Sequence, residues 1–280
     1  MEFKSVKIVL ISLTLVIALI WAAIFNLPDD RLHLVFCNVG QGDAVLVHQG
    51  STQILIDGGP DQSVLDCLSG HMPFWDREIE MVVATHPEAD HITGLIDVIE
   101  RYNVEHFVLN SNGKDSAVFQ EFRRVVENEG GEVYFPQGGD EIKLAPLKLA
   151  VLWPQSQEKV LGTTTIEGEV NDTSLVLQLS YGEFDALFTG DISTKVEDLL
   201  KLNDTEVLKV AHHGSKYSTS EEFLKQTTPE LAVISVGKNR FGHPTEEVLS
   251  LLNNQSIRIL RTDQQGEVEV VSDGESWYNQ

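Results

Sequence analysis

The chain is poor in cysteine and in basic residues, and both shortages limit what it can be. Its 280 residues include two cysteines, Cys37 and Cys67, which are too few for a disulfide scaffold or for a zinc site built on thiolates. Cys37 lies in an apolar, strand-like run, so we expect a buried free thiol there. Lysine and arginine number 20 against 43 acidic residues, for a formal net charge of -23. Such a surface repels polyanions unless a local basic patch or a bound metal offsets it.

Uncharged apolar runs are short everywhere except at the N-terminus. Residues 8–27 form an apolar stretch of 20 residues without charge, about the length that spans a bilayer as a helix. Lys4 and Lys7 precede it and two aspartates follow it, which favours a cytoplasmic N-terminus with the rest of the chain outside. We therefore expect residues 1–30 to be a cytoplasmic N-terminus and single transmembrane anchor. A cleaved signal peptide, which usually has a shorter apolar core, is the alternative.

From residue 31 onward no low-complexity linker or short-period repeat interrupts the chain. Apolar runs bounded by glycine-containing turns predict strands at residues 31–39, 43–49, 52–59, 79–86, 104–110, 131–135, 147–154, 174–182, 184–191, 206–214 and 230–237, and a final strand pair. Helices are predicted at residues 91–101, 116–129, 194–202, 220–226 and 245–253. Thr194 and Glu197 resemble a capping box at the start of the third. Two halves of this kind indicate sheets packed together with helices outside, in one domain at residues 31–280.

Side chains able to bind a metal gather where the predicted strands end. Loops at strand ends on one edge of a sheet can converge on a single site. Imidazoles and carboxylates brought together there are what a two-metal hydrolase needs. The metal-capable side chains at these places are His86, Glu88, Asp90, His91, Asp191, His212, His213 and His243.

These residues carry a resemblance to a known family. The motif at residues 86–91, His-x-Glu-x-Asp-His, resembles the HxHxDH signature of the metallo-β-lactamase superfamily. The motifs VGQGDA, IDGG, FTGD, AHHGS and FGHP follow the order found in the ComEC/Rec2-type DNA-uptake proteins of that superfamily. The resemblance covers residues 32–271. It implies a four-layer αββα sandwich, here preceded by one N-terminal transmembrane helix.

The resemblance also implies two divalent metal ions, zinc or manganese. The implied ligands are His86, Glu88, Asp90, His91, Asp191, His212 and His243. The first two and His212 would hold one ion, the next two and His243 the other, and Asp191 would bridge them. The ions would lie about 3.5–4 Å apart and share a hydroxide as nucleophile. The choice between His212 and His213 stays open; we favour His212 as ligand, which leaves His213 to contact the substrate or support a ligand.

The sequence departs from the family pattern at two places. Upstream of the bridging aspartate the family usually has a third histidine, where this chain has EVNDTSLVL. Asp172 is a weaker ligand candidate there, and Asn171 is a candidate for holding the substrate. Glu88 replaces an imidazole by a carboxylate, which shifts preference from Zn²⁺ toward Mn²⁺. Asn38 also stands where relatives usually have an aspartate.

Other residues near the motifs have roles that the sequence leaves open. Asp90 and His213 are catalytic candidates together with Asp43, which could approach the metals or only shape a turn. Asp57 is expected to hydrogen-bond a loop near the site. The two residues after the histidine pair could hold a phosphate at a helix start, or simply cap that helix. These two residues are Ser215 and Lys216. The four histidines outside the motifs are expected to be ordinary surface or strand residues: His33, His48, His71 and His106.

The predicted function is a membrane-anchored, extracytoplasmic, binuclear metal hydrolase that cleaves phosphodiesters. By resemblance, DNA is the first substrate, and an uptake channel is the expected partner. The acidic composition opposes this, because few basic residues are available to neutralise phosphates. One alternative is a hydrolase of small extracellular phosphoesters or of other esters or amides. The alternative of another class is a non-catalytic scaffold of an uptake or envelope complex, which would bind no more than trace metal.

Overall fold

The structure is a computed structural model that describes residues 2–25, 28–155 and 170–280. Within these residues, the larger of two sheets has eight strands in the spatial order β15-β14-β1-β2-β3-β4-β5-β6. They are β1 (Leu32–Phe36), β2 (Val45–Gln49), β3 (Thr52–Ile56), β4 (Glu78–Ala84), β5 (Asn103–Leu109), β6 (Glu132–Tyr134), β14 (Val268–Ser272) and β15 (Trp277–Asn279). Strands β3 to β6 are parallel, so their carboxyl ends share one edge of the sheet.

The smaller sheet has seven strands within the same described ranges, in the order β13-β12-β11-β10-β9-β8-β7. They are β7 (Glu141–Leu144), β8 (Leu147–Trp153), β9 (Val176–Tyr181), β10 (Phe184–Phe188), β11 (Val207–Lys209), β12 (Leu231–Ile234) and β13 (Arg258–Arg261). Strands β10 to β13 are parallel, and β7 to β10 are antiparallel. This sheet therefore also presents several carboxyl ends at one edge.

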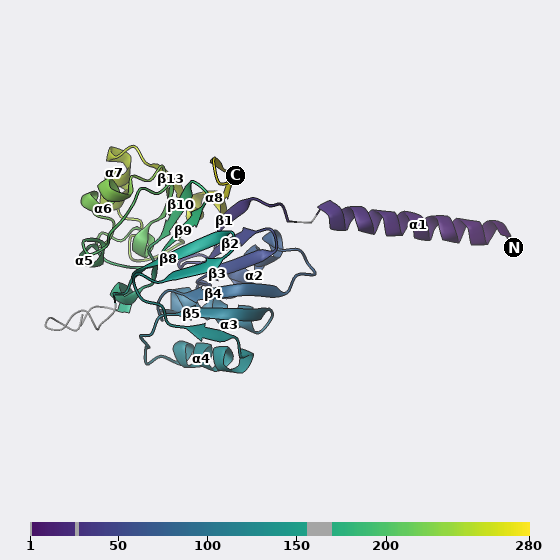
Figure 1. Cartoon of the computed structure of the whole chain (residues 1–280), viewed down its shortest axis with the longest axis horizontal. Coiled ribbons are helices and arrows are strands. Elements are labelled where there is room, and N and C mark those ends of the chain that lie inside the picture. Colours follow the sequence, from purple (N-terminus) through teal and green to yellow (C-terminus); the bar gives the residue numbers. More distant parts are fainter. Residues whose placement is uncertain (1, 26–27, 156–169) are drawn as a thin grey trace.

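Helices cover the outer face of each sheet (Figure 1). The larger sheet carries α2 (Ser63–His71), α3 (Ala89–Ile99) and α4 (Ala117–Glu129), and the smaller carries α5 (Thr194–Glu197), α6 (Glu221–Thr227) and α7 (Glu246–Asn254). The remaining short helices are α8 (Thr262–Gln265), η2 (Val170–Thr173) and η3 (Ala211–Gly214). Phe36 and Phe188 meet between the sheets with ring centroids 6.4 Å apart. Strands buried on both faces read as continuous apolar runs, and the expected αββα sandwich is confirmed.

Two local expectations about helices are wrong. The helix expected at residues 194–202 is the single turn α5, and Glu197 does not cap it. Its buried carboxylate instead accepts hydrogen bonds from the backbone N–H groups of Thr219 and Ser220, at 2.5 and 2.8 Å. The helix expected at residues 220–226 is confirmed as α6 (Glu221–Thr227) with Ser220 as its N-cap, so Ser215 and Lys216 do not stand at the helix start considered for them. In both places backbone groups of a neighbouring loop determine the local structure, and periodicity in the sequence cannot reveal them.

The expectation of a free thiol at Cys37 is also wrong, because Cys37 and Cys67 form a disulfide. Cys37 follows β1, and Cys67 lies in α2, a helix absent from the expected elements. The packing of α2 on the larger sheet brings the two Cα atoms to 5.8 Å, within the usual range of about 4.4–6.8 Å for bonded pairs. Disulfides persist mainly in oxidising compartments.

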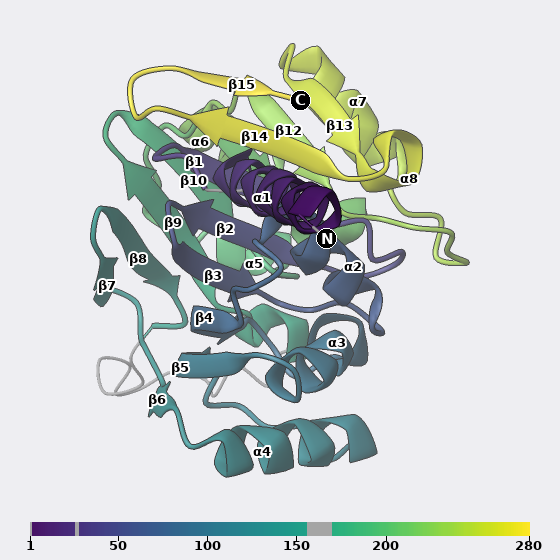
Figure 2. The ribbon, with the colours of Figure 1, turned by 90° about the vertical axis from the view of Figure 1, so that its right-hand side faces the viewer.

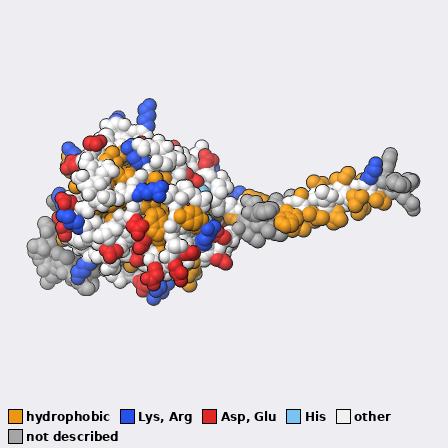
Figure 3. All heavy atoms as spheres, turned by 90° about the horizontal axis from the view of Figure 1, so that it is seen from above, with side chains coloured by type: hydrophobic (Ala, Val, Ile, Leu, Met, Phe, Trp, Pro, Cys, Tyr) orange, Lys and Arg blue, Asp and Glu red, His pale blue; other side chains and the backbone are white. Residues whose placement is uncertain are grey.

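Helix α1 (Glu2–Phe25) lies clear of the sandwich in Figure 1 and is seen nearly end-on in Figure 2. Apolar side chains along it are exposed, Ile8 by 64% for example, and they form an orange band in Figure 3. Across the part of the chain that the structure describes, no helix meets the length and apolarity required to cross a membrane. The expected transmembrane helix at residues 8–27 is therefore unconfirmed, and residues 26–27 lie outside the described residues.

Candidate metal centre

Most of the predicted metal-capable residues come together where strands of both sheets end. His86 follows β4, and Asp90 and His91 lie in the first turn of α3. Asp191 follows β10 in the smaller sheet, and His213 follows β11. Within the described residues, ligand atoms of His86, His91 and Asp191 lie within 4.8 Å of one another, and so do those of Asp90, His91 and His213. The convergence of strand ends thus builds one buried group of side chains.

Close backbone contacts hold α3 at this edge and explain the glycine motifs. The N–H of Gly58 donates to the carbonyl of His91 at 2.7 Å, and the N–H of Gly94 donates to Gly59 at 3.0 Å. A Cβ added at Gly94 would lie 1.9 Å from the carbonyl oxygen of Gly58. Only glycine permits this approach. The IDGG motif therefore positions the first turn of α3, and with it His91.

Two of the buried imidazoles are oriented by one chain of hydrogen bonds. His91 Nδ1 lies 2.8 Å from the carboxylate of Asp57, which also accepts the Thr85 hydroxyl at 2.7 Å. His86 Nδ1 lies 3.1 Å from the same hydroxyl oxygen. Anchoring one ring nitrogen sets the tautomer and turns the other nitrogen toward the site. Asp57 thus forms hydrogen bonds next to the site, as the sequence predicts.

His213 is held in the same way from the smaller sheet. Its Nδ1 lies 2.9 Å from the backbone carbonyl of Ser235, to which it donates. Its Nε2 lies 3.6 Å from a carboxylate oxygen of Asp90 and 3.6 Å from one of Asp191. The backbone of His213 is left-handed, with φ of 55°, a strained conformation that is common at functional sites. The structure therefore places His213, rather than His212, between the two aspartates.

Several polar atoms of this group are buried without any hydrogen-bond partner among the residues described. Ion pairs of 3.3–3.6 Å link some of these atoms to a charged neighbour, but burying them without hydrogen bonds still costs about 1–3 kcal/mol each, and most of them lie around one centre. A divalent cation accepts imidazole nitrogen and carboxylate oxygen together, so the donor set fits metal ions. The unpaired atoms are His86 Nε2, His91 Nε2, His213 Nε2, Asp191 Oδ1, Asp43 Oδ1 and His243 Nδ1.

A buried lysine forms the back of the site. Lys209 ends β11, is 2% exposed, and is ion-paired with Asp43. Its ammonium also donates to the carbonyl of Gly190 at 3.0 Å and lies 3.8 Å from Asp191. Despite the opposing effect of burial, these carboxylates raise the pKa of Lys209. Lys209 was not among the predicted site residues, although a lysine inside the apolar strand VLKVA indicates a buried partner for its charge.

The pKa shifts in the site reflect an excess of carboxylates over basic side chains. Burial alone would raise the pKa of Asp191, but His213 and His91 hold it well below its ordinary value. Burial also opposes charge on His213, yet Asp191 and Asp43 raise its pKa to about 10. The pKa of His86 falls to about 3, chiefly through burial. Four carboxylates meet one ammonium here, so protons on imidazoles supply the positive charge that metal ions would supply.

The remaining predicted residues surround this group at a greater distance or face elsewhere. Glu88 binds Lys114 through both carboxylate oxygens at 2.6 and 2.5 Å, apart from the buried imidazoles. His212 Nε2 lies 3.9 Å from Asp191 and 3.4 Å from the Asn171 amide. The ring of His243 stands at 78° to that of His212, with centroids 5.5 Å apart. These two histidines therefore border the more open side of the centre.

The polar residues proposed from the flanking motifs hold loops. Asp172 is buried and accepts the backbone N–H of Ser193 at 2.8 Å. Ser215 is buried within the turn after the histidines, where its N–H donates to the carbonyl of His212. Lys216 is exposed, with its ammonium 4.9 Å from the Tyr217 ring. Asn38 is exposed as well. None of these contacts orients a side chain into the group of unpaired atoms described above.

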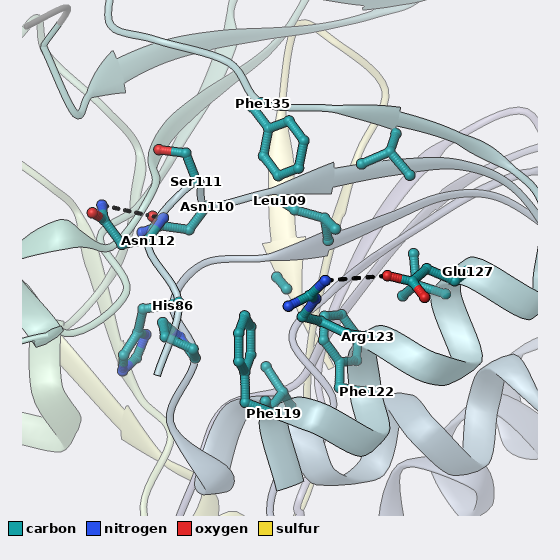
Figure 4. Close-up of a pocket in the computed structure, with 16 residues that line it drawn as sticks. His86, Leu109, Asn110, Ser111, Asn112, Phe119, Phe122, Arg123, Glu127 and Phe135 are labelled. Carbon is teal, nitrogen blue, oxygen red and sulfur yellow. Dashed lines mark hydrogen bonds and ion pairs between the residues drawn. The ribbon is translucent and has the colours of Figure 1, made fainter. Parts of the chain in front are cut away.

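A cavity of about 540 Å³ adjoins the centre and shares His86 with it. It lies between α4 and the ends of β5 and β6. In Figure 4, Phe119 and Phe135 lie on opposite sides of the cavity, with His86 toward one end and Arg123 toward the other. Asn112 offers an amide at the rim, and it donates to Asn110 at 3.0 Å. The volume and the mostly apolar lining of this cavity are typical of ligand pockets, which have volumes of about 300–1,000 Å³.

Comparison with known proteins agrees with this geometry. The model of the metallo-beta-lactamase superfamily matches residues 37–238. ComE operon protein 3 of Bacillus subtilis (strain 168) is 34% identical over 202 residues, which are 69% of this chain and 24% of that protein. Recombination protein 2 of Haemophilus influenzae is 29% identical over 247 residues, which are 83% of this chain and 28% of that protein. The chain thus spans about a quarter of the length of these curated relatives.

A solved structure shows the same fold. The metallo-beta-lactamase fold protein YhfI from Bacillus subtilis aligns with a TM-score of 0.56 at 12% identity, covering 85% of this chain and 99% of that chain. Competence protein ComA of Neisseria gonorrhoeae is 29% identical over 252 residues, which are 86% of this chain and 32% of that protein. The expected resemblance to the ComEC/Rec2-type domain is confirmed by the family model and by these three relatives.

Proposed function

The chain belongs to the metallo-β-lactamase superfamily, and on that premise we propose that it is a metal-dependent phosphodiesterase with DNA as its first substrate. The observation that carries the proposal is the set of buried ring nitrogens and carboxylate oxygens that face one centre without partners among the described residues. A scaffold has no need to bury such atoms unpaired, because each costs stability. In a hydrolase, these buried atoms would bind the metal ions that the reaction needs.

The donor set divides into two overlapping positions. Asp90, His91 and His213 would hold one ion, and His86 would hold the other, with Asp191 between them. His212 and His243 border the second position from its open side. This assignment exchanges His213 for His212 relative to the sequence expectation, because His213 is the histidine that lies near Asp90. Divalent ions in such a centre activate water as a nucleophile and offset the charge of a phosphate.

The other residues of the centre keep these donors in position. Ser235 holds the Nδ1 proton of His213, and Asp57 holds that of His91, so that both Nε2 lone pairs are available. Lys209 neutralises Asp43 and fixes it beside His213, whose Nδ1 lies 3.3 Å from that carboxylate. Asp43 thus acts as a positioning residue. Its burial behind the imidazoles excludes water from that side of the centre.

The adjoining cavity offers a place for the part of the substrate beyond the phosphate. Phe119 and Phe135 present aromatic faces, and Asn112 with Ser111 presents polar groups at the rim. A nucleobase stacks on aromatic rings for about 1–3 kcal/mol per base, which partly offsets the repulsion of DNA by an acidic chain. Phe119→Ala is therefore expected to raise KM for DNA about fivefold to 100-fold while leaving kcat on a small phosphoester unchanged.

We also propose that this is an extracytoplasmic, single-pass membrane protein, although no described helix meets the length and apolarity needed to cross a membrane. The first supporting observation is that the described apolar side chains of helix α1 are exposed. The second is the disulfide between Cys37 and Cys67, which fits an oxidising compartment. The relatives carry names from competence and recombination. We therefore also propose an uptake channel in the membrane as the partner of the enzyme.

The test compares substrates on one metal-loaded protein. The full chain in detergent is loaded with Mn²⁺ or Zn²⁺ and incubated at low salt with single-stranded DNA, duplex DNA or bis-p-nitrophenyl phosphate, with a chelated sample as control. We expect metal-dependent cleavage of the small diester and of DNA. Cleavage of the small diester with DNA intact would replace the nuclease assignment by that of a small-phosphodiester hydrolase. Saturating metal that binds only in trace amounts would remove the enzyme assignment altogether.

A further inference from the structure

Three histidines that the sequence analysis treats as ordinary lie together at the opposite end of the larger sheet. His33 and His48 are direct cross-strand partners in β1 and β2. Glu269 in β14 lies two positions further along the strand, opposite Val35. Alternation along the strands puts these side chains on the face that carries α2, whose last residue is His71. Four separate elements thus contribute to one cluster, which we call the base cluster: His33, His48, His71 and Glu269.

Two of these imidazoles have the arrangement found around bound metals. His33 Nε2 lies 2.9 Å from the carboxylate of Asp29, while its Nδ1 lies 2.6 Å from Glu269 Oε1. His71 Nε2 lies 2.6 Å from Glu267, while its Nδ1 lies 4.0 Å from the same Glu269 oxygen. Each ring therefore has one nitrogen anchored by an outer carboxylate and the other turned toward Glu269. Histidine ligands of metals usually have such an outer partner.

One nitrogen of the third imidazole, that of His48, is free to bind a ligand. His48 is 8% exposed, and its Nε2 is buried without a hydrogen-bond partner in the described chain. Its ring stacks on that of His33 with centroids 4.4 Å apart and an interplanar angle of 7°. Burial, together with the neighbouring His33, lowers the pKa of His48 to about 4. The ring is therefore neutral at physiological pH, and it keeps a lone pair that a cation could use.

The spacing of the donors suits a single ion. One ligand atom each from His33, His48 and Glu269 lies within 4.8 Å of the other two. A cavity of about 280 Å³ lined by the same residues and by His71 connects the cluster to solvent. A tetrahedral zinc site has nitrogen ligands at about 2.0–2.1 Å and oxygen ligands at about 2.0–2.2 Å. The fourth donor, His71 Nδ1, lies outside this group of three and 4.0 Å from Glu269 Oε1.

We propose that the base cluster is a second, structural metal site that takes Zn²⁺ or a similar ion through His33, His48, His71 and Glu269. Binding replaces the proton that His33 shares with Glu269, and that proton is released to solvent. Three imidazoles and one carboxylate favour zinc over magnesium or calcium, which prefer oxygen ligands. The ion links β1, which follows the N-terminal segment, to β2, β14 and α2. The site is independent of the proposed hydrolase function, since it lies at the other end of the sheet.

The alternative is a network of histidines and carboxylates that needs no ion, and the experiment separates the two. The full chain is saturated with Zn²⁺, dialysed, and its metal content per chain is measured by mass spectrometry beside His48→Gln and Glu269→Gln. The control is His106→Gln, since His106 lies on β5 outside the cluster and is ion-paired with Glu132 at 3.7 Å. We expect both cluster variants to carry one zinc fewer per chain than the wild type and the control. Equal zinc content in all four proteins would overturn the proposal.

Two further measurements guard against loss of metal through misfolding. Circular dichroism must show wild-type secondary structure, and each variant must keep the remaining metal content, which reports an intact metal centre. Cobalt substitution then reads the ligands directly. We expect the visible absorption of the wild type minus that of Glu269→Gln to be the intense spectrum of a four-coordinate site. A weak, six-coordinate difference spectrum, or none, would show that the cluster does not bind metal with these ligands.

Discussion

Two clusters of histidines occupy opposite ends of the same sheet, and they manage charge differently. In the metal centre, His86, His91 and His213 are fully buried, and their anchors are themselves buried. In the base cluster, the anchoring carboxylates of Asp29 and Glu267 are open to solvent, with side chains 40% and 38% exposed. Solvent therefore reaches the anchoring groups of the base cluster but not those of the metal centre. The metal centre must therefore carry cations or protons at all times, while the base cluster can lose its ion at a smaller cost.

This difference predicts which substitutions act on one cluster only. The two groups share no hydrogen bond within the described parts of the chain, and effects of substitutions at distant sites usually add. A substitution in one cluster should therefore change the metal content and the stability that depend on that cluster and leave the other cluster unaffected.

Removing the bridging carboxylate should abolish the metal centre. Asp191 lies within 4.8 Å of donors from both proposed ion positions, so Asp191→Ala removes a ligand from each. We expect turnover to fall by about 100-fold to 1,000-fold or more, since metal ions supply several kcal/mol of transition-state stabilisation. Metal content, measured by mass spectrometry, should drop while the ion of the base cluster remains. Wild-type activity in this variant would contradict the bridging assignment, and loss of every ion would contradict the separation of the clusters.

Removing the buried cation should destabilise the chain rather than empty the site. Lys209→Met leaves Asp43 buried without its partner, and breaking a buried pair in this way costs about 3–5 kcal/mol. We expect the free energy of unfolding in denaturant to fall by that amount in the metal-free chain. Bound metal should recover part of the loss, because it supplies positive charge to the same carboxylates. Lys143→Met is the matched control, since the Lys143 side chain is 65% exposed and forms its ion pair, with Glu141, at the surface. An equal loss in both variants would contradict this role for Lys209.

The pH dependence of stability should differ between metal-free and metal-loaded protein. The folded-state pKa of His213 is raised to about 10, so its stabilising contribution is fully present below the ordinary value of about 6.5. That contribution is lost as the pH rises through the folded-state pKa. The metal-free chain should therefore lose stability between pH 7 and 10, and the metal-loaded chain should lose less. His213→Gln should reduce this loss but not remove it, because the pKa of His91 is also raised well above its ordinary value, whereas His48→Gln should leave the profile unchanged. Thermal midpoints measured across that pH range check this.

Much of the metal centre could be predicted from sequence, because its residues lie in motifs at strand ends. His86, Asp90, His91 and Asp191 each follow an apolar run that predicts a strand, and parallel strands end at a shared edge. Packed sheets with helices outside followed from the same pattern, and the αββα order followed from the family resemblance. The choice between His212 and His213 could not be made, because it depends on two successive left-handed residues, with φ of 50° and 55°. That local turn decides which ring lies near Asp90.

The base cluster could not be predicted, because no short motif contains it. Its members come from β1, β2, β14 and α2, and they meet only through the register of strands that are far apart in sequence. The same limit applies to the disulfide, since it needs helix α2 to bring Cys67 to the end of β1. The role of Lys209 could be predicted only in part. A charged residue within an apolar strand signals a buried partner, but only the fold shows that the partner is Asp43.

Substitutions at Glu88 test whether the metal centre extends to this residue, and they should have the smallest effect. Its carboxylate binds Lys114 at a partly exposed position, and such pairs contribute about 0–1 kcal/mol. We expect Glu88→Gln to lower the free energy of unfolding by no more than that and to leave metal content and the preference between Mn²⁺ and Zn²⁺ unchanged. Lys114→Gln should have the same small effect, because it breaks the same pair. A loss of one ion in Glu88→Gln but not in Lys114→Gln would show that metal draws the glutamate away from the lysine, and the centre would then extend to the motif position where relatives have histidine.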